Sequence, residues 1–214
     1  MIDAPLTRAD AVSEKIVFQD DFNQADSIPD RNKWSLCKKG SPAWSKYLSE
    51  SYDQAYVHDG KLVLVAEKVN GVYKTGGVQS LGKAEFQYGK IEICARFTKT
   101  AKGGWPAIWM MPAKPVYSGW PACGEIDIME QLNHDGIVYQ TIHSHYKKMI
   151  WDSLSLFRQK QCLTIKGNSI YLVSSGLPKL FTFKVNGATT LVYPNLHLAD
   201  ESVKSSGRST PLFI

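Results

Sequence analysis

Asparagine-glycine and aspartate-glycine pairs constrain the fold of this chain more than any other feature. Such pairs favour the tight turns of β-hairpins, because both residues tolerate positive φ. The stretches between the turns are short and alternate apolar with polar residues, and no long amphipathic helical pattern is present. The sequence therefore predicts an all-β sandwich. The turn pairs are Asp59-Gly60, Asn70-Gly71 and Asn186-Gly187, and strands are expected at 16–18, 61–66, 90–97, 105–111, 125–130, 137–146, 180–185 and 189–193.

The length and composition fit one domain with its own apolar core. The chain has 214 residues, of which 43% are hydrophobic and 11% aromatic, which is enough for a sizeable core. We expect residues 1–15 to form a flexible lead-in and residues 16–214 to form a single domain. We also expect the protein to be a monomer.

Charge and hydropathy exclude several classes of partner. The net charge is +5, but the basic residues form no long block, so neither nucleic acid nor a membrane surface is expected to bind. No apolar run approaches the roughly 18 residues of a transmembrane helix, and the first residues do not resemble a signal peptide.

The four cysteines lack metal-binding spacing. Cys94 lies in a strand pattern, where we expect a buried free thiol.

The stretch 125–130, Glu-Ile-Asp-Ile-Met-Glu, places three carboxylates within six positions. Positions i and i+2 share a face of a strand, so Glu125 and Asp127 point the same way. Glu130, at i+5, would point to the other face unless a β-bulge near Met129 returns it to the acidic side. Like charges this close repel one another, so stability does not explain the arrangement. The alternative is a solvated outer face that is acidic by coincidence.

Two glutamates leaning towards each other across a bulged strand are suited to the cleavage of glycosidic bonds. Retaining glycosidases need a nucleophilic carboxylate and an acid/base carboxyl about 5–5.5 Å apart. Glu125 and Glu130 can meet that requirement, and Asp127 would hydrogen-bond the nucleophile and tune its charge. This chemistry requires no cofactor.

Several stretches resemble, in the same order, glycoside hydrolase family 16. The resemblance covers roughly residues 16–146 and returns at 180–197, and it implies a concanavalin-like β-jelly-roll sandwich. The E-x-D-x-x-E spacing is similar to the bulged branch of that family, which includes laminarinase-like endo-β-1,3-glucanases, agarases and carrageenases. The stretches that carry the resemblance are Phe18–Phe22, Tyr88–Arg96, Gly104–Met110 and Trp120–Glu130.

The resemblance also implies a role for each acid. Glu125 matches the nucleophile, Asp127 its assisting carboxylate and Glu130 the acid/base residue of a retaining mechanism. The stretch Trp105–Trp109 is more similar to the laminarinase-like members than to the galactan-cleaving ones. Family members often bind a structural calcium near the first strand, to which Asp20 or Asp21 could contribute here.

Tryptophan and histidine side chains near the acids are candidates for substrate contacts. Sugar rings present apolar C–H faces that pack against indole rings. Trp105 and Trp120 are the strongest candidates, whereas for Trp109 a core position is the more economical interpretation than a subsite. His143 could contact the sugar beside Glu130, or it could be a hydrogen-bonded structural histidine.

Three other residues have plainer interpretations. Glu92 and Arg96 share a strand face and could line the cleft, although ordinary solvated or paired charges are the more economical interpretation. His145, two residues beyond the candidate His143, is expected to be structural.

Residues 147–178 and 204–214 do not resemble the family, and we expect the jelly roll to be incomplete at its C-terminal end. One permitted choice of codons for Lys204–Ile214, read from two bases later, encodes Val-Lys-Trp-Pro-Phe-Asp-Thr-Pro-Phe-Tyr. The same shift applied to a permitted choice of codons for Leu172–Pro178 encodes Gly-Val-Glu-Trp-Thr-Pro. Both are motifs expected of the family. We therefore hypothesise frameshifted segments after Tyr146 and after Val203, which the underlying DNA sequence would test.

The resulting functional hypothesis is an endo-acting, retaining hydrolase of β-1,3-glucan or mixed β-1,3/1,4-glucan. Two alternatives stay open, namely a hydrolase of an algal galactan and an inactive glucan-binding relative with an altered C-terminal half. A polymeric substrate implies an extracellular or periplasmic protein.

Overall fold

The computed structural model describes residues 15–86, 88–98, 101–114, 118–143, 159–162, 170–177, 180–194 and 212–213. The predicted lead-in, His145 and most of the two atypical segments lie outside these residues. The described residues contain no α-helix, which confirms the all-β prediction. They accordingly include no helix that could cross a membrane.

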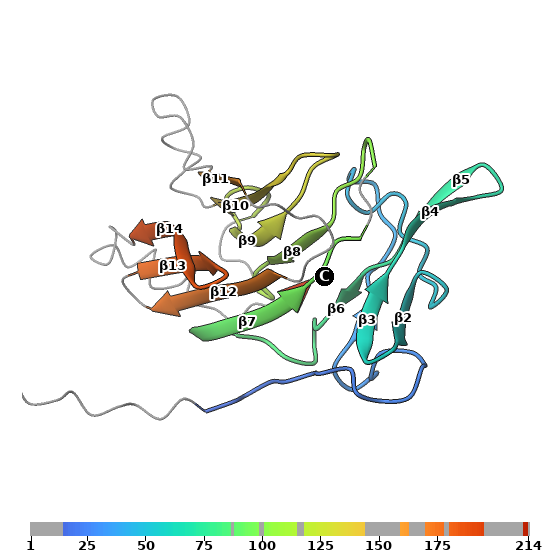
Figure 1. Ribbon diagram of the computed structural model, residues 1–214, viewed down its shortest axis with the longest axis horizontal. Helices are drawn as coiled ribbons and strands as arrows, with labels where there is room; N and C mark the ends of the chain where they lie inside the picture. The colour runs from blue at the N-terminus through green and yellow to red at the C-terminus, as the bar shows by residue number, and fades with distance from the viewer. Residues whose placement is uncertain are drawn as a thin grey trace, which may run out of the picture.

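Two stacked sheets form the body of the molecule (Figure 1). The larger sheet has seven strands in the order β1-β6-β15-β8-β9-β10-β11, and the smaller has four in the order β14-β13-β12-β7. Two further two-stranded sheets, β2-β3 and β4-β5, lie at the end of the molecule near β6. The strands of the large sheet are β1 (Ser35–Leu36), β6 (Val78–Gln79), β8 (Ala107–Met110), β9 (Glu125–Glu130), β10 (Ile137–His143), β11 (Gln159–Cys162) and β15 (Leu212–Phe213). The others are β2 (Ala55–His58), β3 (Lys61–Leu64), β4 (Ala66–Val69), β5 (Val72–Thr75), β7 (Gly89–Ala95), β12 (Ile170–Leu177), β13 (Leu180–Val185) and β14 (Ala188–Pro194).

The three predicted hairpin turns are confirmed. Asp59-Gly60 joins β2 to β3, Asn70-Gly71 joins β4 to β5, and Asn186-Gly187 joins β13 to β14. Both residues of each pair have positive φ, between 48° and 83°. This is the geometry of type I′ turns, whose twist matches that of the flanking strands.

The core lies between the two sheets. Alternate residues of β9 and β8, such as Ile128 and Ile108, point into it and are at most 3% exposed. Phe183 and Val185 of β13 meet them from the smaller sheet. The acidic residues of β9 therefore point away from the core, on the outer face of the larger sheet.

Two expectations about individual segments were wrong. Residues 16–18 form no strand, since none of the strands in the described part of the chain is paired with them, and Ile16 and Val17 are more than 70% exposed. Cys94 is exposed rather than buried, since Ile91 and Ile93 take the core-facing positions of β7.

Parts of the atypical segments are strands of the two sheets. β12 lies between β13 and β7 in the smaller sheet. β15 lies between β6 and β8 in the larger one, where Phe213 is paired with both Gln79 and Trp109. The frameshift hypothesis concerns the gene and stays a prediction.

Candidate active site

A β-bulge brings the three carboxylates of β9 to one face. Asp127 is paired with Trp109 and Thr141, whereas Glu130 is paired with Ala107 and Tyr139. Two residues of β9 lie between these pairs, but each neighbouring strand contributes only one. The extra residue restores Glu130 to the face of Asp127, as the spacing predicted.

A buried polar network supports the bulge. The Nε2 group of Gln140 donates a hydrogen bond to the carbonyl oxygen of Ile128, at 3.1 Å. The Oε1 atom of Gln140 accepts one from the hydroxyl of Thr190, at 2.5 Å. Gln140 lies on β10 and Thr190 on β14, so the network crosses the core from one sheet to the other. The Ile128 carbonyl in the bulge therefore has a side-chain hydrogen-bond donor rather than being left unpaired.

The two outer glutamates each accept a hydrogen bond from a tryptophan. The indole Nε1–H of Trp105 donates to Glu130 at 2.7 Å, and that of Trp120 donates to Glu125 at 3.1 Å. Both tryptophans are more than half exposed. Their ring faces are thus available to a ligand, while their N–H groups orient the carboxylates.

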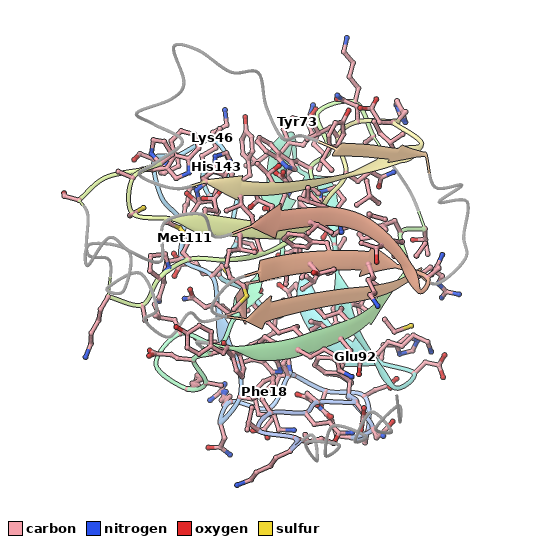
Figure 2. The ribbon with its side chains drawn as sticks, turned by 90° about the vertical axis from the view of Figure 1, so that its left-hand side faces the viewer. Phe18, Lys46, Tyr73, Glu92, Met111 and His143 are labelled. Carbon is pink, nitrogen blue, oxygen red and sulfur yellow. The ribbon has the colours of Figure 1, made fainter. Side chains whose placement is uncertain are left out.

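His143 lies against the two carboxylates at the N-terminal end of the acidic strand. Its Nε2 atom is 3.3 Å from Asp127 Oδ2 and 3.6 Å from Glu125 Oε1. The ring of Trp120 packs against the imidazole, with 5.0 Å between the ring centroids. Figure 2 shows His143 on β10 of the larger sheet. His143 is therefore a contact of the acids, and its interaction with a sugar stays a prediction.

The environment of Glu125 disfavours its charged form. Burial, followed by the negative charge of Asp127, raises the pKa of Glu125 to about 7, while a protonated His143 would lower it. A hydrogen bond between the Glu125 and Asp127 carboxyls raises the pKa further. The two groups therefore titrate as a pair that can share one proton near neutral pH.

The same side chains could hold a metal ion. One ligand atom from each of Glu125, Asp127 and His143 lies within 4.8 Å of the others. Trp120 donates its N–H to one of these acids, and a metal ion on that oxygen would have to displace this donor. Protons and hydrogen bonds can therefore also satisfy these three side chains without a metal ion.

An aromatic pair continues the same face of the sheet beside Asp127. Trp109 packs edge-to-face against Trp44, with 5.1 Å between the ring centroids. Trp109 belongs to a small apolar cluster with Cys37 and Leu48, which favours the structural interpretation of this residue. Trp44 is 48% exposed and was not identified as a site residue from the sequence. In the sequence, the only indication of a role for Trp44 was its apolar side chain within a polar loop.

The remaining predicted residues lie elsewhere. Glu92 points outward from the smaller sheet, where Lys90 pairs with it at 3.7 Å, so it does not line the cleft (Figure 2). Arg96 is the residue directly after β7, the strand that carries Glu92. Asp20 accepts hydrogen bonds from the Trp34 indole and the Phe22 backbone N–H.

Comparisons with known proteins identify relatives of this chain. The family model described as "XgeA-like, catalytic GH16 domain" matches residues 43–170. A keratan-sulfate endo-1,4-β-galactosidase from Sphingobacterium multivorum is 41% identical over 138 residues, which is 61% of this chain and 32% of the relative. A β-glucanase from Rhodothermus marinus is 32% identical over 141 residues, which is 61% of this chain and 48% of the relative. The chain thus spans between a third and a half of the length of these relatives.

Solved structures extend the match beyond the region of the family model. An endo-acting O-glycanase structure from the human gut microbiota, described as initiating mucin breakdown, has a TM-score of 0.79 and 32% identity. It covers 93% of this chain and 84% of the solved one. Laminarinases are among the other structures that share the fold. Since the family model matches more than half of its length, the chain belongs to glycoside hydrolase family 16.

Proposed function

We propose that the chain is an endo-acting hydrolase that cleaves a β-linked polysaccharide with retention of configuration. The observation that carries the proposal is the bulge that puts Glu125, Asp127 and Glu130 on one outer face, between two exposed indoles. Three acids held in this way are costly for folding and useful for glycosidic bond cleavage.

In the first step Glu125 attacks the anomeric carbon while Glu130 protonates the leaving oxygen. Attack requires the charged form of Glu125, so the proton that this carboxyl holds near neutral pH must leave it before the step. A protonated His143, 3.3 Å from Asp127 and 3.6 Å from Glu125, favours negative charge on both carboxylates. In the second step Glu130 acts as base and activates the water that releases the sugar.

Two substrate classes are each supported by a specific observation. β-1,3-Glucan or mixed-linkage β-1,3/1,4-glucan is supported by the β-glucanase relative and by the laminarinases that share the fold. A galactan of the keratan sulfate type is supported by the endo-1,4-β-galactosidase relative, whose identity to this chain is the higher of the two.

Incubation with defined polysaccharides separates these classes. Reducing ends would be measured after incubation with laminarin, barley glucan, keratan sulfate and agarose, using the native chain and Glu125→Gln. The proposal predicts oligosaccharide products from laminarin, barley glucan or keratan sulfate, and at least a thousandfold slower release in Glu125→Gln. Binding of a glycan without products would contradict it and would favour an inactive binding protein, while release from agarose alone would favour an algal galactan.

A further inference from the structure

A basic pocket lies at β1, the edge strand of the larger sheet. Its volume is about 340 Å³. It is open to solvent on one side and combines an aromatic ring with long cationic side chains. The residues that line it are Arg31, Trp34, Ser35, Leu36, Lys38, Tyr52 and Lys83.

All the charged side chains that line this pocket are cations. The Arg31 guanidinium lies over the Tyr52 ring, 5.5 Å from its centroid, and Lys83 donates a hydrogen bond to the Arg31 carbonyl oxygen. Lys38 pairs with Glu50 at 3.1 Å. In the described part of the chain, neither Arg31 nor Lys83 has a carboxylate within salt-bridge distance.

The acids nearest in sequence make other hydrogen bonds. Asp30 accepts one from the backbone N–H of Asn32, and Asp53 accepts one from the hydroxyl of Ser51. The pocket therefore offers two cationic groups without a carboxylate partner, beside an aromatic ring.

The strand register places this pocket in line with the catalytic acids. Successive directly paired residues run from Asp127 to Trp109, then to Phe213, Gln79 and Ser35. Directly paired residues share a sheet face, and four strand spacings amount to about 19 Å. Ser35 thus lies at the far edge of the acidic face, and the pocket that it lines together with Trp34 and Leu36 is at this edge of the sheet. An oligosaccharide of several residues spans this distance.

We propose that this pocket binds an anionic group of the glycan whose scissile bond lies between Glu125 and Glu130. The Tyr52 ring would pack against a sugar face, while Arg31 and Lys83 would bind a sulfate ester or a carboxylate. The inference rests on the proposed function and on its second substrate class, a galactan of the keratan sulfate type. Laminarin carries no charge that could neutralise these cations.

Glycan binding by charge-altered variants tests the proposal. Arg31→Gln/Lys83→Gln would be made in the Glu125→Gln background, so that the ligand is not cleaved. The matched control is Lys90→Gln/Lys184→Gln, which removes the same charge from the smaller sheet. Dissociation constants would be measured for keratan sulfate, chemically desulfated keratan, laminarin and a polygalacturonate oligosaccharide, with circular dichroism as a check on folding.

The expected result is a five- to tenfold weaker affinity for keratan sulfate in the pocket variant, an unchanged affinity in the control, and a smaller effect on the desulfated polymer. The affinity of the parent should also fall as salt is added. The same pattern with polygalacturonate instead would assign the pocket to carboxylates.

Equal losses for charged and neutral glycans would overturn the proposal, as would equal losses in the pocket variant and the control. Failure to bind any anionic glycan would overturn it too. Because reducing ends from laminarin, barley glucan, keratan sulfate and agarose are measured separately on the native chain, these failures are distinguishable from failure of the proposed hydrolysis.

Discussion

At the scale of single residues, the site concentrates negative charge where solvation is poor. Asp127 is 4% exposed at its side chain and Glu125 is 17% exposed. Burial and the neighbouring charge together raise the pKa of Glu125 to about 7. The free energy of unfolding should therefore depend on pH through this residue.

The first prediction follows from that linkage. The folded chain binds a proton on Glu125 more tightly than the unfolded chain, so native stability falls as pH rises from about 4.5 to about 7. Glu125→Gln removes this dependence and should stabilise the protein at pH 8 by about 1–2 kcal/mol. Urea unfolding at pH 4 and pH 8 measures the difference, and an equal effect at both values would contradict the shifted pKa.

The second prediction concerns His143. Its protonated imidazole lowers the pKa of Glu125, so His143→Asn should raise that pKa. The acidic limb of the kcat/KM profile, along which activity rises with pH, should therefore move to higher pH. A lower rate with an unmoved limb would instead indicate that His143 only positions the sugar.

The common sheet face of the three acids could be predicted from the sequence, because strand alternation and a single bulge suffice to place them there. The hydrogen bonds that orient them could not, since Trp105 lies 25 residues from Glu130. Cys94 was misplaced because a cysteine was expected to be buried, although strand alternation puts it on the face of Lys90 and Glu92, opposite Ile91 and Ile93.

At the scale of elements, the bulge in β9 is the feature on which the site depends. Its backbone accepts a hydrogen bond from Gln140 of the neighbouring strand β10, and Thr190, 50 residues further along the sequence, bonds Gln140 from across the core. No periodicity signals such a contact. The bulge itself was predictable from the spacing of the acids, whereas the network that supports it was not.

The third prediction tests that network. Gln140→Leu leaves the Ile128 carbonyl without the Gln140 amide, whereas the Thr190 hydroxyl keeps the Phe183 carbonyl oxygen as its acceptor. The substitution should lower the free energy of unfolding by about 1–3 kcal/mol. Because Glu130 follows the bulge, kcat should fall more than KM rises. Thr190→Ser keeps the hydroxyl and serves as the control. A stable Gln140→Leu protein with native kcat would show that the bulge does not need this support.

The fourth prediction concerns the contact between the two hairpins, where the residue after β5 packs against the residue before β2. A Cβ atom at Gly76 would lie 1.8 Å from the backbone oxygen of Gln54, whereas one at Gly136 would meet nothing within 4 Å. Gly76→Ala should therefore destabilise the protein by at least about 2 kcal/mol, and Gly136→Ala should be close to neutral. Thermal unfolding measures both, and equal midpoints would contradict the described packing.

At the scale of the whole molecule, the sandwich presents one outer face with acids in its middle and cations at its edge. The all-β class and the hairpins followed from turn pairs and alternation. The strand order could not be predicted, because β15 is inserted between β6 and β8 from the far end of the chain. Pairing between segments so distant in sequence leaves no local pattern.

The central claim is that Glu125 and Glu130 cleave a β-linked glycan by double displacement. The measurement that tests it most directly is proton NMR of the anomeric signals during the first minutes of hydrolysis of whichever polysaccharide is cleaved. Double displacement predicts that the β-anomer of the new reducing end appears first and then equilibrates to the α-anomer. An initial α-anomer would show inversion and would contradict the roles assigned to these two residues.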